Sequence, residues 1–274
     1  MEYKIFDAHS HWASVVKMAR FEELEDIATL ESIEFIKQHG EFLKGSTKKL
    51  VELYLMLMDH YGIDKSQVFS VIPEDNQFMS LMGKNGKGRL FPLGMVSPKM
   101  GDLEQQLNQV HELGLFGLKI HPDYQKLDFK SPEFSDIFEF CQEHRMIVIS
   151  HTGSHGNLRD IVAQAARFPD LPFIVGHMGL GPQVDQAYKA AAEHENVYLE
   201  ISGQGYQYMI QGAVDDARIG VQKVLFGSDF PSLAPQVELE KIFSLDITQA
   251  EKQDIFAGNL TRLYQSTLKK HIAW

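Results

Sequence analysis

The sequence is short of cysteine, of long apolar runs and of positive charge, and each shortage excludes a class of protein. The one cysteine, Cys141, cannot form a disulfide within the chain, which is typical of proteins from a reducing cytoplasm. No stretch reaches the roughly 18 uncharged apolar residues of a membrane helix, and the N-terminus lacks the basic-then-apolar layout of a signal peptide. The net charge of −11 disfavours nucleic acid or an anionic membrane as partner. We therefore expect a cytoplasmic protein with a small-molecule ligand, and the sequence leaves homo-oligomer formation open.

What the sequence does contain is a set of short apolar runs that end in histidine or aspartate. These runs cover residues 5–11, 118–121, 147–151, 173–177 and 224–229. Runs of β-branched and aromatic residues bounded by glycine and proline predict buried strands. A polar group at one strand tip is ordinary, but five such tips indicate one site where imidazoles and a carboxylate converge on a metal ion.

The order of the predicted elements indicates an α/β fold. From about residue 67 onward, strand-like runs alternate with amphipathic helical stretches, the pattern of repeated βα units on a parallel sheet. Eight strands are predicted, at residues 3–9, 67–72, 90–96, 117–121, 147–151, 173–177, 197–201 and 224–229. Eight strands suit a closed (β/α)8 TIM barrel, and we expect one domain over residues 1–274.

Two segments depart from a simple barrel. Residues 12–62 are too long for one crossover, so we expect extra helical turns over the barrel mouth, with Phe35, Phe42 and Tyr54 supplying an apolar wall of the substrate pocket. Residues 248–268 predict two short helices on the barrel exterior, joined at Gly258-Asn259.

The first strand carries the densest group of candidate ligands. Because side chains alternate along a strand, Asp7, His9 and His11 are expected on one side, with the two histidines close enough to bind one ion. A lone His-x-His motif more often has an ordinary structural explanation. Together with His151 and Asp229 on other strand tips, it predicts a metal site.

Six motifs follow one another from end to end of the chain. They are Asp7-Ala8-His9-Ser10-His11, Gly117-Leu118-Lys119-Ile120-His121-Pro122, His151-Thr152-Gly153, Gly176-His177-Met178-Gly179, Phe226-Gly227-Ser228-Asp229-Phe230-Pro231 and Gly258-Asn259-Leu260-Thr261-Arg262-Leu263. In this order and spacing the chain resembles the amidohydrolase superfamily, and within it the amidohydrolase-related branch of small lactonases, amide hydrolases and non-oxidative decarboxylases.

The resemblance implies a role for each matching residue. The implied metal ligands are His9, His11, His151 and Asp229. Three nitrogens and one carboxylate suit a single Zn²⁺, with Mn²⁺, Fe²⁺ or Co²⁺ as alternatives. Asp229 would accept the proton of the attacking water and later pass it to the leaving group. His177 would polarise a substrate carbonyl; its alternative role is that of a structural histidine beside the site.

Four further residues are candidates for substrate contact. Lys119 and His121 share one side of the fourth strand and should both face the site. Other branches of the superfamily carboxylate such a lysine to bridge two metals, but we expect one ion, with Lys119 paired to an acid or to a substrate carboxylate. His155 and Arg159 follow the fifth strand on the side where barrel active sites lie, although a place on a helix surface suits Arg159 better than substrate contact.

The leading functional interpretation is a metal-dependent hydrolase that attacks a lactone, ester or amide carbonyl of a small substrate. The alternative is a lyase, a non-oxidative decarboxylase of a small unsaturated or aromatic carboxylic acid, which should have an arginine beside the metal; Arg20 and Arg159 are the candidates. A third interpretation is a metal-binding barrel without catalysis, against which the presence of both His177 and Asp229 argues.

Overall fold

The computed structural model describes residues 3–11, 33–70, 73–121, 125, 132–153, 158–269 and 271–274, and for residues 33–46 only the backbone. Eight parallel strands form the centre of this part of the chain. The strands are β1 (Phe6–Asp7), β2 (Lys65–Phe69), β3 (Leu90–Leu93), β4 (Gly117–Ile120), β5 (Ile147–Ser150), β6 (Phe173–Val175), β7 (Val197–Glu200) and β8 (Val224–Leu225). Each overlaps a run for which the sequence predicts a strand. They pair in the order β1-β2-β3 and β4-β5-β6-β7-β8.

Backbone hydrogen bonds join these two sheets at both of their edges. Between β3 and β4, the backbone amide of Lys119 donates to the carbonyl of Gly94 over 2.8 Å. Between β8 and β1, the amide of Ala8 donates to Phe226 over 2.9 Å, and that of Asp229 donates to His9 over 2.7 Å. The strands therefore follow one another around a ring in chain order, as the prediction of a TIM barrel requires.

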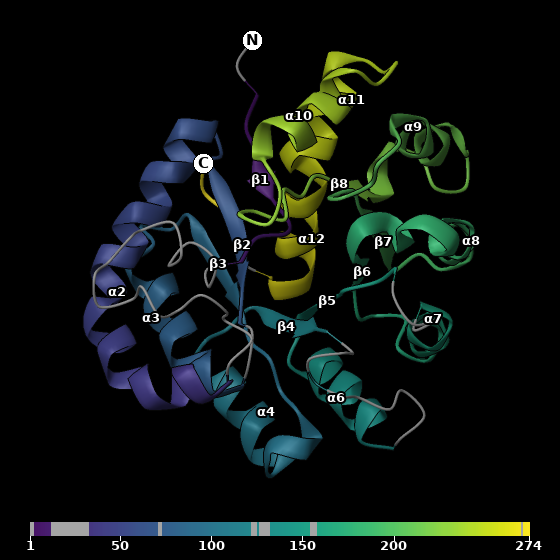
Figure 1. Cartoon of the computed structure of the whole chain (residues 1–274). Helices are drawn as coiled ribbons and strands as arrows, with labels where there is room; N and C mark the ends of the chain where they lie inside the picture. The colour runs from purple at the N-terminus through teal and green to yellow at the C-terminus, as the bar shows by residue number, and fades with distance from the viewer. Residues whose placement is uncertain are drawn as a thin grey trace.

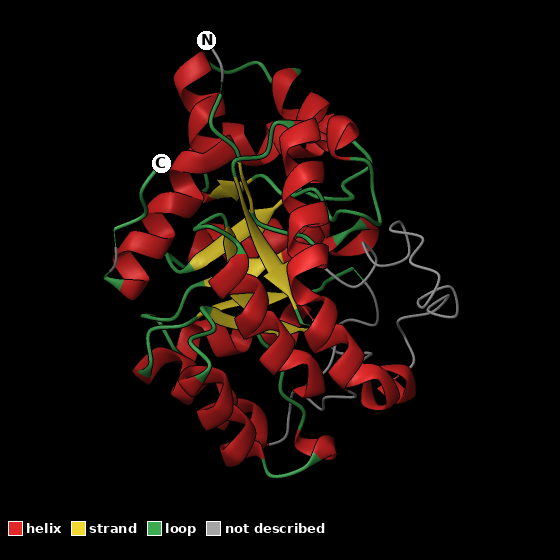
Figure 2. Ribbon diagram, turned by 90° about the vertical axis from the view of Figure 1, so that its left-hand side faces the viewer, coloured by secondary structure: helices red, strands yellow, loops and turns green. Residues whose placement is uncertain are grey.

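The helices surround the strands on the outside, apart from the last one (Figure 1), and a side view shows the strands between them (Figure 2). They are α2 (Ile33–Tyr61), α3 (Asn76–Asn85), α4 (Leu103–Glu112), α6 (Pro132–Glu143), α7 (Leu158–Arg167), α8 (Val184–Glu193), α9 (Gln207–Asp215), α10 (Pro235–Phe243), α11 (Gln249–Gln253) and α12 (Asn259–Leu268). Local signals fix several ends: Asp102 accepts the amide of Gln105 at the start of α4, and Gly114, with φ of 72°, follows its end. None of the helices in the described ranges is long and apolar enough to cross a membrane.

The last helix corrects one expectation from the sequence. Instead of covering the exterior, α12 contributes Tyr264 to the apolar cluster inside the ring, where its ring centroid lies 5.4 Å from that of Phe6 and 5.1 Å from that of Phe91. The hydroxyl of Tyr264 donates to Oε1 of Gln67 over 2.7 Å. Because Phe6 and Phe91 stand at the beginnings of their strands, α12 closes the N-terminal end of the barrel. In Figure 1 it lies in the middle of the strands.

The prediction for the segment after β1 fails at Tyr54, the one predicted pocket residue there whose side chain lies in the described part of the chain. Residues 12–32, including Arg20, and the side chains of Phe35 and Phe42 lie outside the described residues. Tyr54 does not line an open pocket: it is 1% exposed, its hydroxyl donates to Oγ of Ser10, and its ring lies 6.1 Å from that of Phe230. This part of α2 therefore packs against the outer wall of the barrel.

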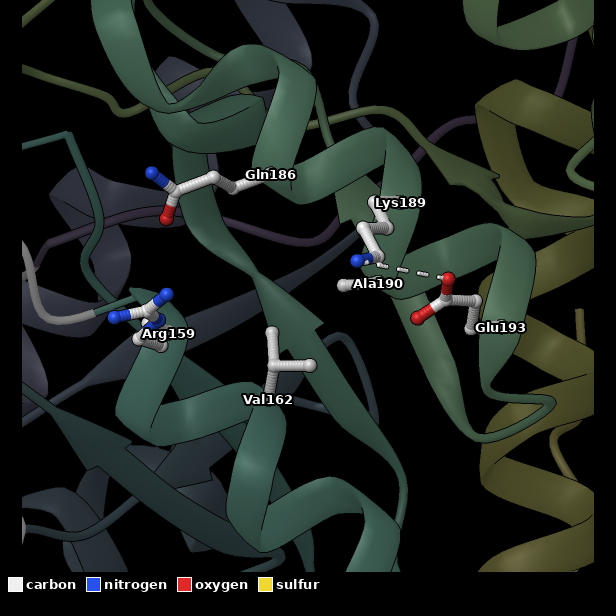
Figure 3. Close-up of a pocket in the computed structure, with 6 residues that line it drawn as sticks. All are labelled: Arg159, Val162, Gln186, Lys189, Ala190 and Glu193. Atoms are coloured by element: carbon white, nitrogen blue, oxygen red, sulfur yellow. Dashed lines mark ion pairs between the residues drawn. The ribbon is translucent and has the colours of Figure 1, made fainter.

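On the opposite side of the ring, α7 and α8 border a surface pocket (Figure 3). Arg159 stands at the start of α7, exposed to solvent, and points toward Gln186 of α8. Lys189 and Glu193, which also line the pocket, form an exposed ion pair of 3.9 Å. The structure thus places Arg159 on the helical surface, which is the ordinary alternative that the sequence left open.

Candidate metal site at the strand tips

Three side chains from the two ends of the chain meet at the C-terminal end of the barrel. Oδ1 of Asp229 lies 3.1 Å from Nε2 of His11 and 3.5 Å from Nε2 of His9. Donor atoms around a tetrahedral ion with bonds of about 2.1 Å are about 3.4 Å apart, so this spacing fits one metal ion. The side chains of His11 and Asp229 remain 19% and 16% exposed, which leaves the position open toward solvent.

A carboxylate that the sequence analysis missed fixes the orientation of His9. Nδ1 of His9 donates to Oε2 of Glu200, at the end of β7, over 2.6 Å, and both side chains are fully buried. Burial, reinforced by nearby Lys119 and His177, lowers the pKa of His9 well below its usual value. The imidazole is therefore neutral, with its lone pair on Nε2, which lies 3.5 Å from Oδ1 of Asp229; this is the form in which histidine binds a metal.

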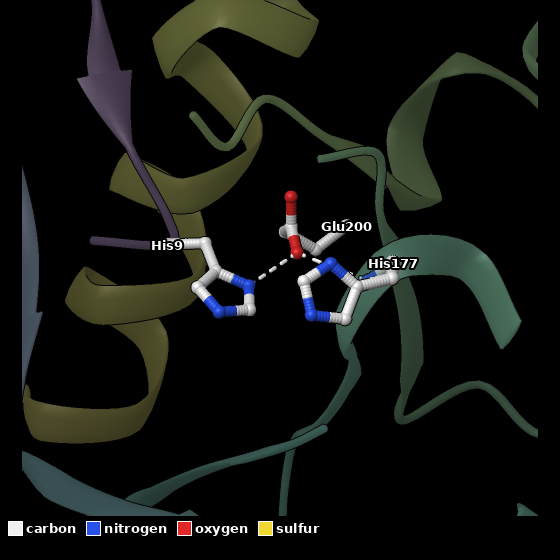
Figure 4. Close-up of side chains that lie close together, drawn as sticks. All are labelled: His9, His177 and Glu200. Atoms are coloured by element: carbon white, nitrogen blue, oxygen red, sulfur yellow. Dashed lines mark hydrogen bonds and ion pairs between the residues drawn. The ribbon is translucent and has the colours of Figure 1, made fainter. Parts of the chain in front are cut away.

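Glu200 itself has little capacity left for a metal. His9, His177 and Glu200 lie close enough to form a second potential ligand group (Figure 4). However, Oε2 of Glu200 also accepts the amide of His177 over 3.1 Å and the hydroxyl of Ser202 over 2.9 Å, and Oε1 accepts the amide of Ser202. Since these donors occupy the carboxylate, Glu200 orients other side chains, and the group beside His11 and Asp229 is the better candidate for a metal site.

His151 is connected to this cluster through His177. Nδ1 of His177 lies 3.0 Å from the carbonyl of Ser202, which can only accept, so Nδ1 carries the proton. Nε2 of His177 then accepts from Nδ1 of His151 over 3.1 Å. Nε2 of His151 is then the unprotonated nitrogen, and burial lowers the pKa of that ring to about 3. The fourth predicted ligand is therefore neutral and oriented.

The carboxylate of Asp7 bonds to backbone amides, although strand alternation placed Asp7 on the same side as His9 and His11. β1 ends at Asp7 and the chain bends at Ala8, which interrupts the alternation. The carboxylate of Asp7 accepts the amides of His9 and Ser228, each over 2.9 Å. Its role is to fix the turns that follow β1 and β8.

The backbone at two of the site residues is held in a sparsely populated conformation. His177 has φ of 63° and Asp229 has φ of 49°, both in the left-handed region. Such conformations cost about 1–3 kcal/mol each and persist where surrounding contacts determine them. His177 lies two residues after the end of β6 and Asp229 four residues after the end of β8, so both strained residues lie in turns at the C-terminal end of the barrel.

Lys119 lies beside the proposed ion position. Its side chain is 1% exposed, its Nζ donates to Nε2 of His9 over 3.0 Å, and it lies 4.6 Å from the centre of the Phe69 ring. Burial lowers its pKa to about 8, against the attraction of Asp229 and Glu200. Among the described residues Lys119 forms no ion pair, so an anionic ligand would compensate its charge.

Of the other three candidates for substrate contact, the structure places one at the site and one away from it. His121 belongs to the site: its ring stacks on that of His151 with centroids 4.3 Å apart, and burial lowers its pKa to about 2. His155 lies outside the described residues, and Arg159 borders the pocket between α7 and α8. The sequence did offer a signal for Glu200, a single acid at the end of an otherwise apolar strand.

The comparisons with known proteins agree with this architecture. The family model described as Amidohydrolase matches residues 6–265. Three similar solved structures are 5-carboxyvanillate decarboxylase LigW from Sphingomonas paucimobilis (16% identity, TM-score 0.67), a dihydroxybenzoic acid decarboxylase from Polaromonas with bound manganese and 2-nitroresorcinol (14%, 0.64), and a probable 2-pyrone-4,6-dicarboxylic acid hydrolase from Acinetobacter baumannii with bound citric acid (14%, 0.66). Each match covers 96% of this chain and, in the order given, 99%, 97% and 99% of the other chain. No curated protein matches. At these identities the structural likeness establishes the fold.

Proposed function

The chain belongs to the amidohydrolase family, and from that premise we propose that it is a metal-dependent hydrolase acting on a lactone, ester or amide carbonyl of a small substrate. The observation that carries the proposal is the spacing of His9, His11 and Asp229, whose donor atoms surround one partly exposed position at the C-terminal end of the barrel. Barrel enzymes hold their active sites at that end.

The residues present fit a divalent ion. His9, His11, His151 and Asp229 would hold it; burial keeps the imidazoles of His9 and His151 neutral, and their hydrogen bonds with Glu200 and His177 orient them. When bound, the ion would polarise a carbonyl oxygen and make a water molecule more acidic. Zinc suits three nitrogens and one oxygen, and manganese, present in the Polaromonas decarboxylase, is the first alternative.

Asp229 is the proposed proton carrier. Burial would raise the pKa of its carboxyl group, but the hydrogen bond from His11 and the electrostatic influence of the surrounding imidazoles outweigh burial and hold the pKa well below its usual value. The group is therefore an ionised acceptor, able to take a proton from the attacking water and deliver it to the leaving group.

For His177 the geometry favours orientation of a neighbour over direct contact with substrate. Its two ring nitrogens are engaged by Ser202 and His151. To polarise a substrate carbonyl, as the family resemblance implies, its Nε2 would have to exchange His151 for the substrate and carry a proton. We therefore assign His177 first to fixing the ring of His151.

A decarboxylase is the second candidate, favoured by Lys119. A buried ammonium beside the ion position suits a substrate that bears a carboxylate, and two of the similar structures are decarboxylases of aromatic acids. The arginine that this reaction should use is not supplied by Arg159, which faces the outer pocket.

One experiment separates the two reactions. The purified protein, stripped with chelator and reloaded with zinc or manganese, is incubated with lactones, N-acyl compounds and aromatic acids while acid release and evolved CO₂ are followed. We expect metal-dependent acid release without CO₂. CO₂ from an aromatic acid would replace the hydrolase with the decarboxylase, and turnover that survives complete metal removal would overturn the metal-dependent mechanism.

A further inference from the structure

The turn after β7 supports His177 directly. The amide of Gln204 donates to the carbonyl of Ile201 over 3.1 Å, which closes a tight turn around Ser202 and Gly203. Within it, the carbonyl and the hydroxyl of Ser202 each lie 3.0 Å from Nδ1 of His177. The position of this turn therefore decides which nitrogen of His177 carries the proton and where the ring points.

A second carboxylate, from α10, holds the same turn on its other side. Oε2 of Glu238 accepts the amide of Gly203 over 3.1 Å. Glu238 is 2% exposed, and Nζ of Lys241 donates to both of its oxygens over 2.8 and 2.7 Å. A buried carboxylate with a cation and a loop amide as partners is a fixed anchor, because any movement would leave a charge unpaired.

The same helix begins immediately after the turn that carries Asp229. The carbonyl of Asp229 accepts the amides of Ser232 and Leu233 over 2.8 and 3.2 Å, and the chain then enters α10 at Pro235. Leu233 approaches the β7 turn so closely that its Cδ1 would lie 3.6 Å from a side chain placed on Gly203. The turns after β7 and β8 are thus in contact and share one helix as their support.

We propose that Glu238 and Lys241 form a clamp that sets the position of His177 relative to Asp229. Both of those residues are in left-handed backbone conformations that neighbouring contacts must maintain. The clamp connects the turn that orients His177 to the helix that follows Asp229. Glu238 is then a positioning residue that acts through Gly203 and Ser202, and its effect on turnover rests on the proposed function.

The test compares Glu238→Ala with Glu238→Gln. Alanine removes the acceptor for the amide of Gly203, whereas glutamine keeps a carbonyl oxygen that can accept it. In Glu238→Ala we expect the ¹⁵N signals of the His177 ring to lose the pattern of a single Nδ1–H tautomer and the Gly203 amide to exchange faster. We expect kcat to fall by about 10–100-fold with KM little changed, as for other residues that orient ligands. Glu238→Gln should restore most of both signals and of kcat.

The matched control is Glu240→Ala, on the exposed side of the same helix, which should leave the His177 signals and kcat at wild-type values. If Glu238→Ala does not fold, Lys241→Gln decides: shifted His177 signals support the clamp and unchanged signals overturn it. A folded Glu238→Ala with wild-type His177 signals also overturns it. Because the ring signals need neither metal nor substrate, they separate failure of the clamp from failure of the hydrolase assignment.

Discussion

The same eight strands form both ends of this barrel, but the side chains that meet at one end are polar and those at the other end are apolar. At the C-terminal end, Glu200 and Lys119 hydrogen-bond to His9 and Asp229 lies 3.1 Å from His11, and the backbones of two residues are in strained conformations. At the N-terminal end, Tyr264 of α12 packs among Phe6 and Phe91 and closes the interior. One end can therefore hold an unfavourable polar cluster because the other end supplies apolar packing.

The largest expected effect is at the polar end. Asp229→Asn removes the proposed proton acceptor but keeps the volume of the side chain, so turnover should fall by about 100- to 10,000-fold while the melting temperature changes little. Asp215→Asn, at an exposed position of α9, is the control. Near wild-type kcat in Asp229→Asn would remove this residue from the mechanism.

The complementary change at the closed end should affect stability alone. Tyr264→Ala removes a fully buried ring and should lower the free energy of unfolding by about 3–5 kcal/mol. Tyr264→Phe removes only the bond to Gln67 and should lower it by about 1 kcal/mol. Denaturant unfolding measures both, and metal affinity of the folded variants should equal that of the wild type. A loss of metal affinity would mean that the two ends are coupled.

A substitution of Glu200 tests which group at the polar end orients His9. In Glu200→Gln an amide group replaces one acceptor oxygen, so His9 loses part of the support that orients it, and metal affinity should fall by about 10–100-fold. Competition with a chelating dye measures the affinity. Glu195→Gln, at a fully exposed position, should bind metal as the wild type does. Unchanged affinity in Glu200→Gln would contradict the assignment of Glu200 as the orienting group.

The smallest expected effect has the opposite sign. Lys119→Met keeps an apolar chain of similar length but removes a buried cation beside the ion position, so metal affinity should rise by about tenfold. If an anionic substrate is found, its KM should increase in the same variant. Weaker metal binding in Lys119→Met would show instead that the lysine contributes to holding the ion.

The sequence predicted what lies on strands and missed what depends on packing between elements. The eight strands and the meeting of His9, His11 and Asp229 were predictable, because apolar runs locate strands and parallel strands bring their tips together. Glu200 was missed because a single acid at a strand end equally suits a surface ion pair. The inward packing of α12 could not be read from its amphipathic pattern, which says that one face is buried but not against what.

Anomalous X-ray diffraction from crystals grown with zinc, and again with manganese, tests the central claim most directly. We predict one peak about 2.0–2.3 Å from Nε2 of His9 and His11, from Nε2 of His151 and from an oxygen of Asp229. A second peak about 3.5–4 Å away, bridged by density at the tip of Lys119, would contradict the single ion but not the site. The absence of any peak at the strand tips, or a peak bound to Glu200, would contradict the account itself.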